Sequence, residues 1–367
     1  MKSLYIHIPF CDKKCFYCSF VVSIGQQKRV DEYLDALSVE AKRYEGQPLK
    51  TIYIGGGTPS FLNSAQIEML FKMIRDNFDC SAVDEITFEL NPENVYLEKV
   101  ETLLAAGVTR VSCGIQTFND KYLKFLGRNH SGESAKAALL KLKEAGFHNI
   151  SADFMFSLPG QSEHDIAVDL RQFKQFGCQH VSLYALTIEP NARFYTRKIE
   201  LPNLNRQADQ YVFVRQEVEA LGFKQYEVSN FAQAGFESKH NINYWDDGEY
   251  LGLGVGAHSY VANKRFWNVP NMFDYLKRMR SLKPVIDGES ILTNEEQLKD
   301  AFLFGLRMNK GVDVNSLQDK YGCAMDEKVR NTVSELIAEG YMLHEPPLYK
   351  ATDKGRLVLD EISVRLL

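Results

Sequence analysis

Strand-like and helix-like segments alternate along the chain up to about residue 221. Strands separated by helices pair in parallel through right-handed crossovers. Six such units therefore predict an α/β fold with an incomplete parallel (β/α)6 barrel. The six strand-like segments are SLYIHIP (3–9), TIYIGGG (51–57), EITFELNP (85–92), RVSCGIQTF (110–118), ISADFMFSLPG (150–160) and HVSLYALTIEP (180–190).

The alternation ends near residue 230, and this change divides the chain. The segment HNINYWDDGEYLGLGVGAHSY (240–260) is rich in aromatic residues and glycine, and helical patterns dominate from about residue 290. We therefore predict a barrel over residues 1–235 and a connecting segment over 236–288. A smaller, mainly helical, winged-helix-like domain is predicted over 289–367.

Composition restricts the class of function. Hydrophobic residues make up 45% and charged residues 25% of the chain, which is an ordinary globular balance. A net charge of −5 does not favour general binding of nucleic acid. The sequence has no run of 18 apolar residues, and MKSLYIHIPFCDKK lacks the apolar core of a signal peptide, so we expect a cytoplasmic protein.

Three cysteines stand close together in CDKKCFYCSF, with the spacing C-x3-C-x2-C: Cys11, Cys15 and Cys18. Thiolates are soft ligands that suit zinc or iron–sulfur clusters. A structural zinc site takes four ligands, and no second cysteine pair follows. Three cysteines would instead hold three irons of a 4Fe–4S cluster and leave the fourth iron open. Zinc, or cysteines that only pack, are the alternatives. Ordinary packing roles are expected for the other cysteines, Cys80, Cys113, Cys178 and Cys323.

Unusual residues also follow the other strand-like segments, in GGGTPS, ELNPE, GIQTF and ADFMFSLPG. The carboxyl ends of barrel strands meet at one edge, where the βα loops form the active site of a barrel. Glycines at such a strand end let the backbone approach a ligand closely, although GGG can also be an ordinary turn. A surface ion pair is the alternative for each charged residue taken alone.

Together these motifs resemble the radical S-adenosylmethionine (SAM) superfamily. YIHIPFCDKKCFYCSF, GGGTPS, GIQTF and LPGQ are similar to the branch that contains oxygen-independent coproporphyrinogen III oxidase and the HemW heme chaperones. The resemblance covers nearly the whole chain and includes FLFGLRMNKGVDV near its end. It implies a barrel of the radical SAM type whose open iron binds the amino and carboxylate groups of SAM. The SAM-contacting positions that it implies are Tyr5, Tyr17, Gly56, Gly57, Thr58, Glu89, Gln116, Arg128, Asp153 and Ala185.

Two features separate the branches of this family. In the oxidase another cysteine follows two residues after the third, whereas this chain has Phe20 there, as the HemW chaperones do. HNINYW fits the H-N-x-x-Y-W motif that is associated with heme in that family. The resemblance implies heme contacts from His240, Asn241, Tyr244 and Trp245. The histidine could ligate iron and the aromatic rings could cover a porphyrin face. A histidine beside a helix with aromatic residues in the core is the alternative, and His258 in GAHSY is a further candidate partner.

We therefore expect a heme chaperone with a 4Fe–4S cluster, SAM and heme as cofactors. Heme-acceptor proteins such as respiratory cytochromes would be its partners, with no role for nucleic acid. The resemblance also allows a homodimer and transient contact with a membrane surface. Coproporphyrinogen III dehydrogenase is the second hypothesis, and a radical SAM methyltransferase or heme-degrading enzyme is the third. Catalytic residues stay unassigned, and oxidase activity is not expected.

Overall fold

A curved sheet of 12 strands forms the framework of the computed structural model, which describes residues 3–367. Its six central strands lie side by side in chain order and are all parallel. The prediction of an α/β fold built on a parallel sheet is confirmed. These strands are β1 (Ser3–Ile8), β5 (Thr51–Gly56), β7 (Glu85–Leu90), β8 (Arg110–Gln116), β9 (Ile150–Phe156) and β10 (His180–Ala185).

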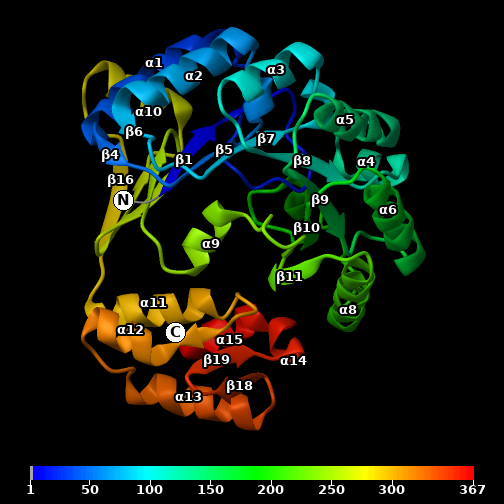
Figure 1. Cartoon of the computed structure of the whole chain (residues 1–367), viewed down its shortest axis with the longest axis vertical. Coiled ribbons are helices and arrows are strands. Elements are labelled where there is room, and N and C mark those ends of the chain that lie inside the picture. The colour runs from blue at the N-terminus through cyan, green and yellow to red at the C-terminus, as the bar shows by residue number, and fades with distance from the viewer. Residues whose placement is uncertain (1–2) are drawn as a thin grey trace.

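Helices cover the outer side of this sheet, and in Figure 1 they follow an arc with the strands inside it. Several begin where the sequence provides a cap: the side chains of Asn63, Ser131 and Ser162 each accept a hydrogen bond from the first helical turn. The helices are α1 (Val30–Ala41), α2 (Ser64–Asn77), α3 (Leu97–Ala105), α4 (Asp120–Leu126), α5 (Gly132–Glu144), α6 (Glu163–Gln175), α7 (Arg193–Thr196) and α8 (Leu204–Ala220).

Alternation along each strand gives the sheet one apolar and one polar face. Ile54, Phe88 and Val111 belong to the buried core under the helices. Side chains one position away point to the opposite face, because successive residues of a strand alternate. Tyr53, Glu89 and Arg110 are therefore directed into the barrel. Parallel strands are more often apolar on both faces, so the polar inner face marks a site.

Further strands extend the sheet at both edges. The segment predicted as a connection over 236–288 adds β13 (Tyr250–Leu253), which pairs in parallel with β1. The antiparallel strands β14 (His258–Val261), β15 (Lys264–Asn268) and β16 (Ile286–Ile291) follow it. At the other edge β12 (Asn230–Ala232) and β11 (Lys224–Glu227) are antiparallel. The strand order ends on β11 and β16, so the barrel is open. The same region holds α9 (Lys239–Trp245) and α10 (Met272–Arg280).

A second hydrophobic core lies in the C-terminal region, which is below α9 in Figure 1. It is mainly helical, with a small sheet in the order β17-β19-β18. Its elements are α11 (Asn294–Gly305), β17 (Val312–Asp313), α12 (Val314–Tyr321), α13 (Glu327–Ala338), β18 (Met342–Glu345), β19 (Leu348–Ala351), α14 (Asp353–Arg356) and α15 (Leu359–Leu366). Short strands elsewhere are β2 (Phe10–Cys11), β3 (Ser23–Ile24), β4 (Gln47–Pro48) and β6 (Phe78–Asp79).

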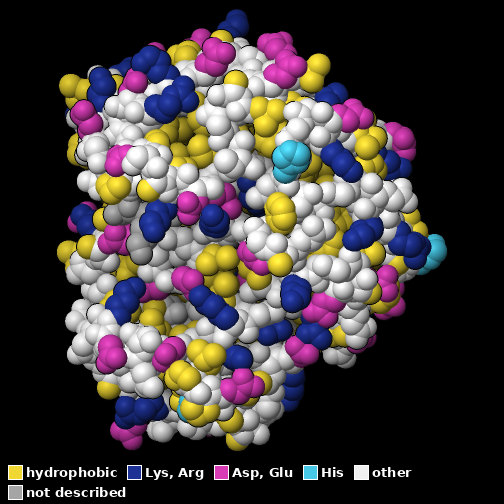
Figure 2. Space-filling view, in the orientation of Figure 1, with side chains coloured by type: hydrophobic (Ala, Val, Ile, Leu, Met, Phe, Trp, Pro, Cys, Tyr) yellow, Lys and Arg dark blue, Asp and Glu magenta, His cyan; other side chains and the backbone are white. Residues whose placement is uncertain are grey.

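Basic and acidic side chains are interspersed over the face shown in Figure 2. Ion pairs join the C-terminal region to the barrel, among them Arg307 with Glu227 at 3.2 Å and Arg215 with Asp353. Between residues 3 and 367, no helix combines the length and the apolar character needed to span a bilayer.

Candidate functional site

A pocket of about 420 Å³ lies at the carboxyl ends of the central strands, and we call it the cysteine pocket. The three clustered cysteines line it together with residues from five of the six strand ends. Nearly all of the predicted SAM-contacting residues are present: Tyr17, Gly56, Gly57, Thr58, Glu89, Gln116, Arg128, Asp153 and Ala185. The segment that carries the cysteines, residues 11–20, is called the cysteine loop, and it lies over the polar inner face of the barrel.

Each of two cysteines has a polar partner in this pocket. The sulfur of Cys11 is hydrogen-bonded to Thr58 Oγ1 at 3.2 Å, and the guanidinium of Arg128 donates to Cys15 Sγ at 3.7 Å. Burial raises the pKa of the Cys11 thiol to about 12, so a metal centre must displace its proton. Among residues 3–367, no group of three or more His, Cys, Asp or Glu side chains is arranged to hold a single metal ion.

Glycines bring the backbone close to the cysteine loop. Gly56 has a φ of +116°, and a Cβ on it would lie 2.6 Å from the ring of His7. A Cβ on Gly57 would lie 2.8 Å from the carbonyl of Pro9 and 3.0 Å from Cys11 Sγ. A side chain at Gly57 would therefore collide with the segment that carries Cys11, and a side chain at Gly56 would collide with His7 on β1.

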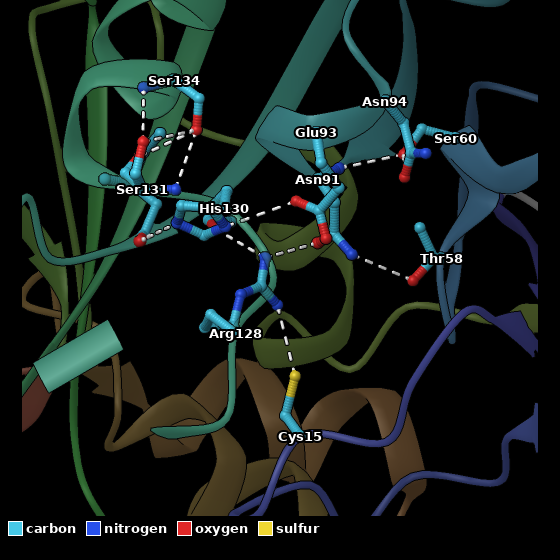
Figure 3. A network of polar contacts seen from close by, with 12 residues as sticks. Cys15, Thr58, Ser60, Asn91, Glu93, Asn94, Arg128, His130, Ser131 and Ser134 are labelled. Atoms are coloured by element: carbon cyan, nitrogen blue, oxygen red, sulfur yellow. Dashed lines mark hydrogen bonds and ion pairs between the residues drawn. The ribbon is translucent and has the colours of Figure 1, made fainter. Parts of the chain in front are cut away.

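Arg128 is the centre of a polar network that joins three strand ends (Figure 3). Its guanidinium donates to Asn91 Oδ1 at 2.7 Å and to the carbonyl of Gly114 at 2.9 Å. The amide of Asn91 in turn donates to Thr58 Oγ1 at 3.1 Å. The buried Nε atom of Arg128 has no partner within the described chain, and neither has that of Arg110. These unpaired donors fit a pocket that receives polar atoms of a ligand.

Two carboxyl groups lie deeper in the cysteine pocket. Burial raises the pKa of Glu89 to about 7, although Tyr53 donates a hydrogen bond of 2.7 Å to Oε1 and the amide of Gly56 one of 3.2 Å to Oε2. Burial also raises the pKa of Asp153, which accepts hydrogen bonds from Ser112 at 3.0 Å. Such carboxyl groups can accept from the amino or hydroxyl groups of a bound ligand.

A second pocket of about 550 Å³ lies beside the first, and we call it the aromatic pocket. Ser19 and Phe20 of the cysteine loop line both pockets, and the phenyl ring is 64% exposed. The remaining walls come from β1, α9, α11 and the glycine-rich turn before β14. The other lining residues are Tyr5, His7, Val21, Tyr244, Trp245, Tyr250, Gly256, Ala257, His258 and Phe304.

The structure separates some residues that the sequence analysis grouped. Tyr5 was predicted in the SAM site, but it lines the aromatic pocket together with His7, which lies two positions along on the same face of β1. The four residues of HNINYW do not share one pocket. Asn241 lines the cysteine pocket, whereas Tyr244 and Trp245 line the aromatic pocket.

His240 lines neither pocket and is fully buried. One ring nitrogen, Nδ1, is hydrogen-bonded to Thr51 Oγ1 at 2.8 Å, and the other, Nε2, to the hydroxyl of Tyr244 at 2.9 Å. Burial lowers the pKa of His240 to about 3, so the ring is neutral. In this conformation no ring nitrogen of His240 is available to a ligand. The expected role of this residue as a heme ligand therefore lacks geometric support.

Sequence reasoning missed several polar residues of the cysteine pocket. Asn91, Tyr53 and Arg110 line it, and Arg110 is only 1% exposed. Period-two alternation could have found two of them. Tyr53 and Gly55 lie two positions apart and therefore on the same face of β5. Arg110 lies on the same inner face as Gln116, which ends β8. The sequence feature that could have identified Asn91 is its position directly after the strand β7.

Comparisons with known proteins agree with this architecture. Residues 5–173 match the Radical SAM superfamily, and residues 292–358 match the HemN C-terminal domain. A protein of Lactococcus lactis named "Heme chaperone HemW" is 36% identical, and the alignment covers 99% of this chain and 98% of that protein. The protein of the same name from Bacillus subtilis is 38% identical over 99% of this chain and 98% of its own length.

A solved structure has the same overall fold. It is described as "Coproporphyrinogen III oxidase (HemN) from Escherichia coli is a Radical SAM enzyme", and its TM-score to this chain is 0.85 at 25% sequence identity. The match covers 100% of this chain and 89% of that one. The likeness thus includes both the barrel and the C-terminal region.

Proposed function

Because the chain belongs to the HemW family within the radical SAM superfamily, we propose that it is a heme chaperone, which binds heme and delivers it to acceptor proteins. The observation that carries this proposal is the near-complete alignment with relatives that bear the name of heme chaperone. The acceptors would be heme proteins such as respiratory cytochromes, met in the cytoplasm or at a membrane surface.

The cysteine pocket suits the cofactors of the superfamily. Cys11, Cys15 and Cys18 would hold a 4Fe–4S cluster, and the polar residues around Arg128 and Glu89 would hold SAM beside it. Support comes from the close backbone approach at Gly57 and from the unpaired donors of Arg128 and Arg110. When bound, the cluster supplies the electron for cleavage of a carbon–sulfur bond in SAM, which is chemistry of the cofactor itself. The residues of the chain bind and orient the two groups.

Coproporphyrinogen III dehydrogenase is the second candidate, and its support is the TM-score of 0.85 to the oxidase from Escherichia coli. A shared fold does not separate two functions, since the same fold can carry different sites. Phe20 favours the chaperone because it stands where the resemblance places an additional cysteine in the oxidase. Its exposed ring contributes to both pockets.

One experiment separates the two candidates. Purified protein, reconstituted anaerobically with iron and sulfide, is incubated with heme in one sample. The second sample receives coproporphyrinogen III, SAM and a reductant. We expect one heme bound per chain and no loss of carboxyl groups from coproporphyrinogen III. Formation of protoporphyrinogen IX would favour the oxidase, and the absence of heme binding would refute the chaperone.

A further inference from the structure

His258 differs from the other histidines near the aromatic pocket. Its ring stacks on Trp267 with centroids 5.8 Å apart, and neither ring nitrogen has a hydrogen-bond partner within residues 3–367. His7 lines the same pocket, but its Nε2 is hydrogen-bonded to the carbonyl of Val21 at 2.8 Å and its Nδ1 to Tyr5 at 3.0 Å. His258 is exposed at the pocket wall and is the histidine there with free nitrogens.

The ring of His258 is also in the right protonation state for a metal ligand. Partial burial lowers its pKa below the usual value for histidine, so the imidazole is neutral near pH 7. A neutral imidazole can donate a nitrogen lone pair to iron, and a protonated one cannot.

The aromatic pocket has the size and lining for a mostly apolar ligand. Its volume of about 550 Å³ lies within the ~300–1,000 Å³ range of small-molecule sites. The rings of Tyr244, Trp245 and Tyr250 line it, and so does the ring of Phe20 from the cysteine loop. Aromatic side chains of this kind cover porphyrin faces through broad apolar contact.

Two guanidinium groups flank the rings of this pocket. Arg307 lies 4.4 Å from the ring centroid of Trp245, and Arg265 lies 5.5 Å from that of Phe304. Each also has an acidic partner, Glu227 and Asp300 respectively. The positive charge at both rings suits an apolar ligand that carries carboxylate groups at its edge, as heme does.

We infer that the aromatic pocket is the heme site and that His258, rather than His240, supplies the axial ligand to the heme iron. This inference rests on the proposed function, because it assumes that the chain binds heme. The imidazole of His258 would donate a nitrogen lone pair to the iron, with no change in oxidation state. Tyr244 and Trp245 of HNINYW keep a role as part of the wall, whereas His240 holds α9 in place from inside the core.

The test compares four variants with the wild-type protein: His258→Ala, His258→Met, His240→Ala and His344→Ala. His344 is the matched control, because it is also exposed and stacked on an aromatic ring, that of Tyr349, at 4.0 Å in the C-terminal region. Each protein is titrated with heme, and absorption and electron paramagnetic resonance spectra of the bound heme are recorded. Thermal unfolding and cluster content report whether each variant is folded.

His258→Ala is expected to lose the spectrum of imidazole-ligated heme and to weaken heme binding at least about tenfold. Added imidazole should restore the spectrum, and His258→Met should bind heme with a changed spectrum. His344→Ala should behave as wild type, and folded His240→Ala should keep the axial-ligand spectrum. A wild-type spectrum and affinity in His258→Ala would overturn the inference and leave the proposed function intact. Failure of the wild-type protein to bind heme would overturn both.

Discussion

Glu89 should give the proposed SAM site a pH dependence that can be measured. Its pKa of about 7 means that the carboxyl is mostly protonated at pH 6 and mostly ionised at pH 8. The ionised form accepts hydrogen bonds from amino and hydroxyl groups more strongly. We therefore expect SAM affinity, measured by calorimetry, to rise about tenfold between pH 6 and pH 8.

Glu89→Gln is the control, because the amide keeps the size of the side chain and does not titrate. Its SAM affinity should be lower at pH 8 and should change much less with pH. The raised pKa also affects stability in the absence of ligand. The folded protein holds this proton up to about pH 7, whereas the unfolded chain loses it near the usual 4.5, so stability falls as pH rises through that window. An equal pH slope of affinity in both proteins would exclude Glu89 from the site.

The three cysteines should be individually essential for the cluster. Replacement of Cys11, Cys15 or Cys18 by alanine removes one thiolate, and an iron of the cluster then lacks its ligand. We expect each variant to lose the thiolate-to-iron absorption after anaerobic reconstitution. Cys323→Ala, in the C-terminal region, should keep it. A complete cluster in a variant that lacks all three cysteines would refute the assignment.

The sequence predicts some of these residues better than others, and the reason is distance along the chain. Cys11, Cys15 and Cys18 are near neighbours, so spacing alone predicts a common role for them. The position of His240 depends on Thr51, which is 189 residues away, and no local pattern contains that contact. A motif can thus point to a segment and still leave open which of its side chains lines a pocket.

At the scale of elements, the short helix α9 depends on a carboxylate from β7. The buried side chain of Glu85 accepts hydrogen bonds from the backbone amides of Lys239 at 2.9 Å and His240 at 3.0 Å. Amides at the start of a helix have no partner within the helix, and negative charge there is favourable. Glu85→Ala should therefore lower the free energy of unfolding by roughly 2–3 kcal/mol, measured by urea denaturation.

The same change should weaken binding in the aromatic pocket, because α9 carries Tyr244 and Trp245 into its wall. Glu133→Ala is a suitable control, since that carboxylate is 85% exposed near the start of α5. Its stability should stay within about 0.5 kcal/mol of wild type. Equal stability of the two variants would mean that Glu85 does not hold α9.

The elements themselves were predicted unequally. The six parallel strands could be found because each is a β-rich segment followed by a helical pattern, and several of these helices begin at a capping residue. The extension of the sheet by β13 could not, since YLGL is only four residues long and its partner β1 lies about 250 residues earlier. The sequence therefore predicts a connection over residues 236–288, although in the structure this segment contributes strands to one edge of the sheet.

At the scale of the whole molecule, the C-terminal region takes part in the aromatic pocket. Phe304 of α11 faces residues of β1, the cysteine loop and α9 across that pocket. The division into barrel and C-terminal region could be predicted from the change in pattern. A pocket shared by the barrel and the C-terminal region could not be predicted, because it depends on how these two regions are placed relative to each other. Ion pairs such as Arg307 with Glu227 fix that placement.

Phe304→Ala tests this shared pocket. Removing the ring takes apolar surface and one wall from the aromatic pocket, so heme affinity should fall by roughly tenfold, or about 1–2 kcal/mol. SAM affinity should not change, because Phe304 does not line the cysteine pocket.

Phe273→Ala is the matched control, since its ring is 52% exposed on α10 and lines neither pocket. Titrations with heme and with SAM measure both affinities. If the two variants bound heme equally well, the C-terminal region would have no part in the site. If Phe304→Ala alone lost heme affinity while SAM binding stayed constant, the two pockets would be separate sites that different regions of one chain assemble.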